Sequence, residues 1–307
     1  MASSVLLLAR RWPASALGRD AGVGVLVTRP AAPTGGSVIA REGEIDLGFA
    51  DRRVLVAGAS AGIGLATARL LASEGARVAM ASRSVPALAA ASEAIARETG
   101  NAPVPLAADL TVAGEADRLV TATIAALGGL DSLIDCVGGS VRSAFEALSD
   151  EDWLANYTFN VLSAVRLVRA ALPALRQGTD PAIVILGAAS ARQPHPHQIV
   201  SNVHKAGLLG LVKTLAGELA PEGIRVNAVA PGRTLTRLWT ERAERLAAER
   251  GVPADAIIAE FAREIPLGRF GTPEEVATMV VWLASPRTAY VTGQTVNVDG
   301  GIAKGLP

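Results

Sequence analysis

The sequence predicts an α/β protein with one doubly wound, parallel sheet of about seven strands and helices on both faces. Three observations lead to this prediction. Short apolar runs rich in β-branched residues alternate with longer helical stretches, the order typical of a parallel sheet covered on both sides. The runs are almost uninterruptedly apolar, as expected of strands buried on two faces. The first run leads through a glycine-rich turn into a helix.

Each strand is predicted from one such run, beginning with RVLVAG and ARVAMAS. The predicted strands are residues 53–58, 76–82, 104–108, 130–137, 182–187, 224–229 and 294–298. The stretches between them are too long for strands and are rich in alanine and leucine. The predicted helices are residues 59–74, 86–99, 113–127, 150–175 and 203–220. Gly178 provides the stop signal after the fourth of these helices, and Pro221 the stop signal after the fifth.

Composition limits the class of protein. The chain has 307 residues, half of them apolar, with 29 basic and 29 acidic side chains. A zero net charge argues against a nucleic-acid or membrane-surface protein, and no apolar run approaches the roughly 18 residues of a membrane span. A single cysteine excludes a disulfide framework. With no repeat or linker, residues 45–307 are expected to form one domain.

Residues 1–44 differ from the rest, with five arginines and no acidic residue before Asp20. We expect an N-terminal extension that is disordered, in a cytoplasmic protein. An Arg-rich, acid-poor start also fits a mitochondrial presequence, which stays open as the alternative.

The turn after the first predicted strand reads GASAGIG. Its glycines permit a tight turn and a close approach of a ligand to the backbone. The following helix offers unpaired N–H groups and the positive end of its dipole to a pyrophosphate. Glycines also serve plain turns, but the position between strand and helix favours a dinucleotide site in a Rossmann-type fold. The loop residues expected to contact the dinucleotide are Gly58, Ser60, Gly62, Ile63 and Gly64.

The spacing Gly-x-x-x-Gly-x-Gly resembles that of the short-chain dehydrogenase/reductase superfamily, and the resemblance runs from about Ile45 to Gly301. Matching segments follow the third, fourth and sixth strands, and YVTGQTVNVDGG matches the C-terminal strand. The resemblance implies hydride transfer with a nicotinamide cofactor. The further cofactor contacts that it implies are Asp109, Leu110, Gly138, Lys205, Pro231, Gly232, Thr234 and Thr236.

The end of the second strand discriminates between NAD and NADP. An acidic residue there would bind the ribose 2′-hydroxyl and repel a 2′-phosphate. This chain has Ser82 and Arg83 instead, and a guanidinium pairs with a phosphate by charge-assisted hydrogen bonds. NADP is the expected cofactor and NAD the less favoured one. The alternative interpretation is that Arg83 is an ordinary solvated surface residue with no role in cofactor binding.

The catalytic segment departs from the family pattern. Members use a tyrosine as proton donor, a lysine four residues later that lowers its pKa and holds the ribose, a carbonyl-polarising serine and a water-holding asparagine. Here Asn160 and Lys205, one of three lysines in the chain, are present. The tyrosine position holds Ser201, and the serine position holds Ala188, with Ser190 two residues further on. The catalytic set implied by the resemblance is Asn160, Ser201, Lys205 and Ser190.

The proton donor is therefore an open question. An aliphatic hydroxyl has a much higher pKa than the ~10 of a phenol, so Ser201 is a poor general acid near neutral pH, although it can hydrogen-bond a substrate oxygen. Tyr157 shares a helix face with Asn160 by its spacing, or is an ordinary half-buried tyrosine. His197, four residues before Ser201, is a further candidate, because an imidazole is a common general acid near neutral pH. No metal site is expected, because His195 and His197 alternate with prolines.

The run Ser-Asn-Val-His-Lys-Ala-Gly looks like a divergent subgroup similar to 3-oxoacyl-carrier-protein reductases. It is also similar to 2,4-dienoyl-CoA reductases, which pair a Ser-x-x-x-Lys with a phenol that residues 187–200 lack. In this superfamily an insertion such as residues 233–268 forms a helical substrate lid. Its arginines Arg237, Arg242 and Arg245 would suit a phosphopantetheine or CoA phosphate, or a solvated face.

The sequence predicts an NADP-dependent oxidoreductase that reduces a carbonyl or enoyl group of a small or acyl-carrier-bound substrate with an atypical proton donor. The alternative is a protein of this fold without hydride chemistry: a lyase, a cyclase or a nucleotide-binding module. Expected partners are the small-molecule or acyl-thioester substrate and further copies of the chain, with no nucleic acid and no membrane. The resemblance implies a homodimer or homotetramer formed through the helices at 150–175 and 203–220.

Overall fold

The computed structural model describes residues 46–305, and the predicted N-terminal extension at residues 1–44 lies outside them. The described residues form a seven-stranded sheet in the order β3-β2-β1-β4-β5-β6-β7, with every neighbouring pair parallel. The predicted fold class is confirmed. The strands are β1 (Arg53–Ala57), β2 (Arg77–Ser82), β3 (Val104–Ala107), β4 (Ser132–Asp135), β5 (Ala182–Leu186), β6 (Arg225–Pro231) and β7 (Thr295–Val298).

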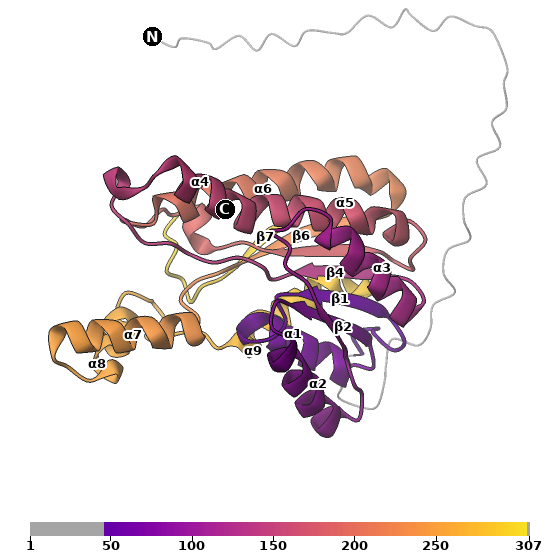
Figure 1. Cartoon of the computed structure of the whole chain (residues 1–307), viewed down its shortest axis with the longest axis horizontal. Helices are drawn as coiled ribbons and strands as arrows, with labels where there is room; N and C mark the ends of the chain where they lie inside the picture. The colour runs from indigo at the N-terminus through magenta and orange to yellow at the C-terminus, as the bar shows by residue number, and fades with distance from the viewer. Residues whose placement is uncertain (1–45, 306–307) are drawn as a thin grey trace, which may run out of the picture.

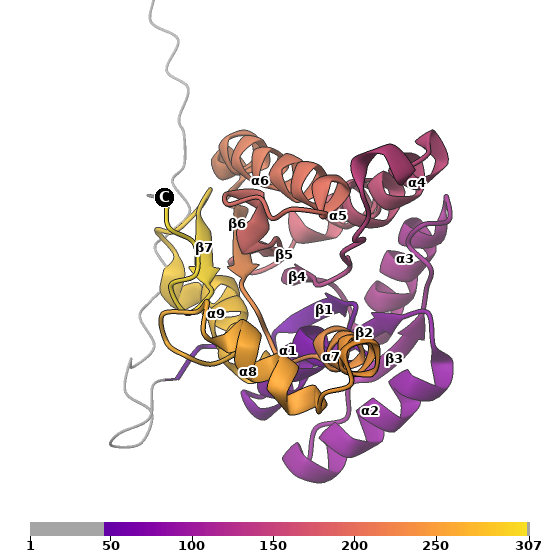
Figure 2. The same ribbon diagram turned by 90° about the vertical axis from the view of Figure 1, so that its left-hand side faces the viewer.

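Helices cover both faces of the sheet (Figure 1). One face carries α1 (Gly62–Ser73), α2 (Val85–Thr99) and α9 (Pro273–Ala284). The other carries α3 (Glu115–Leu127), α5 (Ser163–Leu175) and α6 (Ile199–Leu219). The remaining α-helices are α4 (Asp150–Tyr157), α7 (Arg237–Arg250) and α8 (Ala254–Ala262). Figure 2 shows the sheet between the two helical layers.

Alternate residues of a strand point to opposite faces of a sheet. Each central strand therefore contributes side chains to two hydrophobic cores, one on each face. In β1, Leu55 and Ala57 join the core beneath α3, α5 and α6, whereas Val54 and Val56 join the core beneath α1, α2 and α9. All four side chains are fully buried. This double burial explains why the strand runs are almost uninterruptedly apolar.

The predicted helix at 150–175 is helical throughout but is not a regular α-helix. A π-helical turn at Thr158–Leu162 separates α4 from α5. The turn changes which residues share a face, because it adds one residue per turn at that point. By length and composition, Asp150–Leu175 is the one stretch among the described residues that could cross a membrane. Its Leu167, Ala171 and Leu175 are buried in the core beneath α3 and α6, so it is a core helix.

Two further boundaries differ from prediction in ways that affect the site. Helix α1 begins at Gly62 rather than at residue 59, because residues 58–61 form the turn itself. Helix α6 begins at Ile199 rather than at residue 203. Val200 and Ser201 are buried there, so tertiary packing extends the helix into a segment that reads as a loop. Ser201 is consequently helical and lies one turn before Lys205.

Strand ends of a parallel sheet meet at one edge, and in open α/β sheets ligands bind there, at the point where the strand order reverses. The order reverses between β1 and β4. The loops that follow β1, β2, β3, β4, β5 and β6 all reach this edge, and α7 and α8 (orange in Figure 1) project beyond it.

Candidate active site

A cleft of about 1420 Å³ lies along the carboxyl edge of the sheet. It is lined by residues from the loops after six strands and from α6, α7 and α8. Every residue predicted to contact a cofactor or to act in catalysis, except Asn160, lines this cleft. Asn160 lies directly behind its wall, with 1% of its surface exposed.

The glycine-rich turn has the geometry of a phosphate cradle. Gly58 and Gly62 have φ values of 77° and 57°, in the left-handed region that favours glycine. A Cβ on Gly58 would lie 2.9 Å from the Cys136 carbonyl, and a Cβ on Gly64 would overlap the Gly58 carbonyl. Ala61 provides no side-chain cap for α1, so the first-turn N–H groups have no side-chain acceptor and face the cleft.

The loops after β2 and β3 form one end of the cleft. The exposed Arg83 side chain lies with its Cζ 6.0 Å from the centre of the Phe159 ring. Asp109 is held in place by Thr111, which donates to Oδ1 from its backbone N (3.0 Å) and its hydroxyl (2.6 Å). These bonds lower the pKa of Asp109. Ser82 and Leu110 complete this end, where the sequence predicts the adenosine half of the cofactor.

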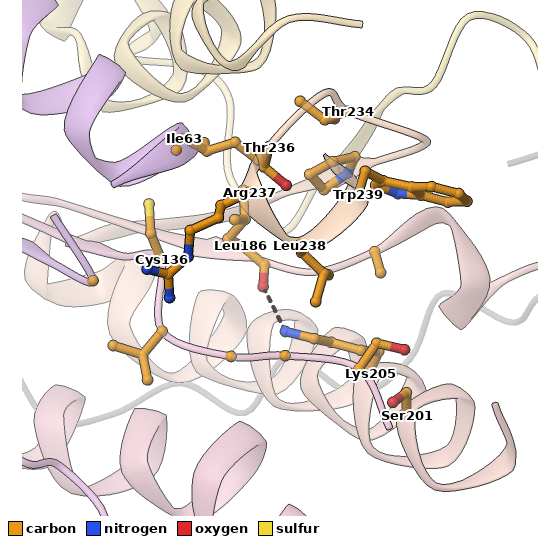
Figure 3. A pocket seen from close by; sticks show the side chains of 18 of the residues that line it. Ile63, Cys136, Leu186, Ser201, Lys205, Thr234, Thr236, Arg237, Leu238 and Trp239 are labelled. Carbon is orange, nitrogen blue, oxygen red and sulfur yellow. Dashed lines mark hydrogen bonds between the residues drawn. The ribbon is translucent and has the colours of Figure 1, made fainter. Parts of the chain in front are cut away.

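Lys205 projects from α6 into the centre of the cleft. Its Nζ donates to the Leu186 carbonyl at 3.2 Å, the dashed line in Figure 3, and Ser201 lies one turn away on the same helix. Burial lowers the pKa of Lys205 to about 8, and the nearby Asp135 carboxylate opposes that shift. Burial also raises the pKa of Asp135 to about 6. Lys205 therefore titrates much closer to neutrality than an ordinary lysine.

Asn160 is oriented by three hydrogen bonds. Its Oδ1 accepts from the Gly139 backbone N at 3.1 Å. Its Nδ2 donates to the carbonyl and to Oδ1 of Asn156, at 3.2 and 3.1 Å. The same Asn156 oxygen lies 2.8 Å from His204 Nδ1. The residue sits in the π-helical turn, which points it toward the loop after β4.

The side chains of Asn160 and Lys205 both lie close to the backbone of Gly138. A Cβ on Gly138 would lie 2.6 Å from Lys205 Nζ and 2.9 Å from Asn160 Oδ1, and its φ is 149°. The absence of a side chain here lets the backbone pass between the two polar groups. The pair that matched the family pattern is thus assembled in space.

The Ser201 hydroxyl oxygen accepts a hydrogen bond from the Val141 backbone N at 3.1 Å. The hydroxyl is buried at the cleft wall, and its own proton stays available for a further acceptor. Ser190 lies in a 3₁₀ turn, Ala189–Ala191, that also lines the cleft, as does Ala188.

Of the two alternative proton donors, His197 lines the cleft and Tyr157 does not. The spacing of Tyr157 and Asn160 predicted a shared helix face, and a π-helical turn begins directly after Tyr157. The Tyr157 ring packs against His204, is 40% exposed and is not part of the cleft lining. Tyr290 is fully exposed, so neither tyrosine of the chain reaches the cleft. His197 does line it, with a φ of 59°.

The segment after β6 closes the cleft on the side of the predicted lid. A Cβ on Gly232 would lie 2.7 Å from Asp299 Cα, and a Cβ on Gly62 would lie 3.4 Å from Thr236 Cγ2. Thr234, Thr236 and Trp239 are seen together on this wall in Figure 3. The apolar residues of α7 and α8 mainly dock the lid, with Trp239 packed on Phe261 and Phe270 at ring-centre distances of 5.3 and 4.9 Å.

Sequence reasoning missed Asn156 and His204, which support Asn160 from behind the wall, and Arg142, which joins the lid arginines across the cleft. The position of Asn156 one turn before Asn160 was a signal for the first pair. No local signal marks Arg142, because it lies in the loop after β4, far along the chain from α7.

Comparisons with known proteins agree with this geometry. A family model described as Enoyl-(Acyl carrier protein) reductase matches residues 58–303. The short-chain reductase protein NovJ of Streptomyces niveus is 34% identical over 247 residues, which are 80% of this chain and 92% of NovJ. L-sorbose reductase from Gluconobacter frateurii, solved with NADPH and L-sorbose, has a TM-score of 0.83 at 33% identity, covering 85% of this chain and all of that one. An NADPH-bound short chain oxidoreductase from Pseudomonas aeruginosa, containing an atypical catalytic center, has a TM-score of 0.78 at 34% identity, covering 84% and 100%.

Proposed function

The chain belongs to the short-chain dehydrogenase/reductase superfamily, and we propose that it is an NADP-dependent reductase of a carbonyl or enoyl group with an atypical proton donor. The observation that carries the proposal is the convergence of Lys205 and Asn160 on Gly138, next to the glycine-rich turn. A nucleotide-binding module without chemistry has no need of a buried lysine and a buried asparagine at this point.

The cleft fits NADP. The turn has no side chain where a pyrophosphate would approach the backbone, and the α1 N-terminus has no side-chain cap. Arg83 suits the 2′-phosphate, and no acidic residue stands beside it at the end of β2. L-sorbose reductase and the Pseudomonas oxidoreductase were both solved with NADPH, which supports the same choice. When bound, NADPH supplies a hydride to the substrate carbon.

The residues of the chain then provide the proton and the orientation. The Ser201 hydroxyl, fixed by the Val141 amide, donates a hydrogen bond to the substrate oxygen. Lys205, with its pKa of about 8, can release a proton near neutral pH and be recharged from water. Asn160, held by Asn156, positions its amide beside Lys205. Hydride on carbon and a proton on oxygen convert a ketone into an alcohol.

A second candidate is a protein of this fold without hydride chemistry, such as a lyase, a cyclase or a nucleotide-binding module. The observation that favours it is that neither tyrosine lies in the cleft. NADPH binding by calorimetry, followed by NADPH oxidation with a panel of ketones and enoyl thioesters, separates the two. We expect binding and turnover in the wild type, and loss of turnover in Ser201→Ala and Lys205→Met.

Tight NADPH binding without wild-type turnover, together with turnover gained in Ser201→Tyr, would establish the second candidate. Absence of NADPH binding would refute the dinucleotide site itself. His197→Ala serves as a further control, since a fall in turnover as large as that of Lys205→Met would make His197 the proton donor instead.

We also propose that the chain forms a homodimer or homotetramer through α4, α5 and α6. The supporting observation is the exposed apolar group Leu154, Tyr157 and Val203 on α4 and α6, two helices that contact each other. Light scattering tests the proposal, with a monomer as the contradicting result.

A further inference from the structure

Four arginines converge on the lid side of the cleft, and from their arrangement we propose that the substrate carries an oxyanion, a carboxylate or a phosphate, bound there. Arg142 follows β4, Arg233 follows β6, and Arg242 and Arg245 belong to α7; all four line the cleft. The inference rests on the proposed reductase function and specifies its substrate class.

Two of the guanidinium groups are fixed on the same pair of aromatic rings. Arg242 Cζ lies 4.4 Å from the ring centre of Trp239 and 4.7 Å from that of Phe261. Arg233 Cζ lies 5.7 and 4.9 Å from the same two centres. Cation–π contacts of this kind hold a guanidinium in place. Arg233 also donates to the Phe261 carbonyl and to Glu264, so Arg242 is the stacked arginine without a carboxylate partner in the described part of the chain. The rings therefore hold two like charges side by side, which an unoccupied solvated surface would not require.

Carboxylates of the protein neutralise only part of this charge. Arg233 pairs with Glu264, and Arg245 Nε lies 3.8 Å from Glu249. Neither Arg142 nor Arg242 has a carboxylate within 4.0 Å among residues 46–305. Arg142 in the loop after β4 and Arg242 on α7 thus have no carboxylate partner among these residues.

The electrostatic consequence is visible in neighbouring groups. Burial, reinforced by Arg142, Arg233 and Arg245, lowers the pKa of Arg242 to about 10. Burial together with Arg233 and Arg142 also lowers the pKa of His195, which lines the cleft. An oxyanion bound at this point would offset the repulsion between the arginines and raise the pKa of both groups.

The proposed cofactor does not account for the arginines. Its phosphates are accommodated by the glycine-rich turn and by Arg83, which follow β1 and β2. The four arginines follow β4 and β6 or lie on α7, across the cleft from β2. The group they bind therefore belongs to the second ligand, the substrate.

Two matched substrate pairs test the inference in the presence of NADPH. A 3-oxo acid is compared with its ethyl ester, and acetoacetyl-CoA with acetoacetyl-N-acetylcysteamine, which lacks the phosphates. We expect one anionic member to be preferred at least 10-fold in kcat/KM. The first pair identifies a carboxylate and the second a phosphate as the anion. Arg142→Gln and Arg242→Gln should each lower kcat/KM for that anionic member about 10- to 100-fold, through KM, and leave its neutral partner unchanged.

Arg263→Gln is the matched control, because Arg263 is exposed near the lid but does not line the cleft. Calorimetric titration of inorganic phosphate into the NADPH-saturated protein gives a readout independent of turnover. We expect binding in the wild type and in Arg263→Gln, and none in the Arg142→Gln/Arg242→Gln double variant.

The outcomes separate this inference from the proposed function. Turnover with equal kcat/KM for charged and neutral members, in wild type and variants alike, overturns the anion site and leaves the reductase intact. Phosphate binding that depends on Arg142 and Arg242, in a protein that reduces no carbonyl or enoyl compound, supports the site and refutes the reductase. Phosphate binding unaffected by the double variant also overturns the site.

Discussion

Asn156 holds the side chain of Asn160: the Asn156 Oδ1 accepts from Asn160 Nδ2 at 3.1 Å and lies 2.8 Å from His204 Nδ1. Because its Nδ2 is engaged in this way, Asn160 presents Oδ1 to the Gly139 N–H beside Lys205. The position of Asn160 thus depends on a residue that does not line the cleft.

Asn156→Ala removes that acceptor and leaves the buried Asn160 Nδ2 with only the Asn156 carbonyl. We expect kcat for NADPH oxidation to fall about 10-fold with little change in KM, and the free energy of unfolding to fall by about 1–3 kcal/mol. Steady-state kinetics and urea unfolding measure the two effects. Asn156→Asp keeps the acceptor and should restore kcat; equal kcat values in the two variants would show that Asn156 does not position Asn160. Glu151→Gln, an exposed change on the same helix, is the control.

Arg83→Ala should weaken NADPH binding about 10- to 100-fold and leave NADH binding almost unchanged, because the lost charge-assisted hydrogen bonds involve only the 2′-phosphate. Calorimetry with both nucleotides measures the difference. Arg97→Ala is the matched control, since Arg97 is exposed on α2 and its Nε donates only to the Glu93 carbonyl. Equal losses for NADPH and NADH would refute the phosphate role of Arg83.

Gly138→Ala should abolish turnover and weaken NADPH binding, because its Cβ would lie 2.6 Å from Lys205 Nζ. The positive φ of 149° adds backbone strain. Gly207→Ala on α6 meets nothing within 4 Å, and replacing a helical glycine by alanine should stabilise the protein by about 0.4–1 kcal/mol. Thermal unfolding and NADPH oxidation measure both variants. A fully active Gly138→Ala protein would contradict the close approach seen at this loop.

Lys205 makes stability depend on pH in the alkaline range. Its pKa is lowered from 10.5 to about 8 in the folded chain, so between these values the unfolded chain binds the extra proton. The free energy of unfolding should therefore rise with pH from about 8 to 10.5, by at most about 3 kcal/mol. Urea unfolding of the cofactor-free protein across this range measures the rise.

Lys205→Met should lose this rise, whereas Lys213→Met, at an exposed position on the same helix, should keep it. NADPH affinity of the wild type should decline above pH 8, as the charge on Lys205 disappears. Identical pH profiles for the wild type and Lys205→Met would show that Lys205 is not the titrating group.

The fold and the nucleotide half of the site were predictable because their determinants are local. Strands buried on both faces, such as β1, are apolar at almost every position. The tight turn that leads into a helix N-terminus requires glycines at a fixed spacing. Lys205 and Ser201 are four residues apart, so one helix suffices to bring them together. Asn160 was recognised by its position in the family pattern, and the structure places it beside Lys205.

The rest was decided by the tertiary structure, because it depends on contacts between segments that lie far apart in the chain. The Ser201 hydroxyl is committed to the Val141 amide 60 residues away. Tyr157 packs against His204 and is not part of the cleft lining, which no periodicity of the sequence reveals. Arg142, Arg233 and Arg242 meet only because the carboxyl ends of β4 and β6 and the start of α7 reach the same edge of the sheet. The glycine spacing therefore predicts a nucleotide site from the sequence alone, whereas the meeting of these arginines depends on the packing of separate segments.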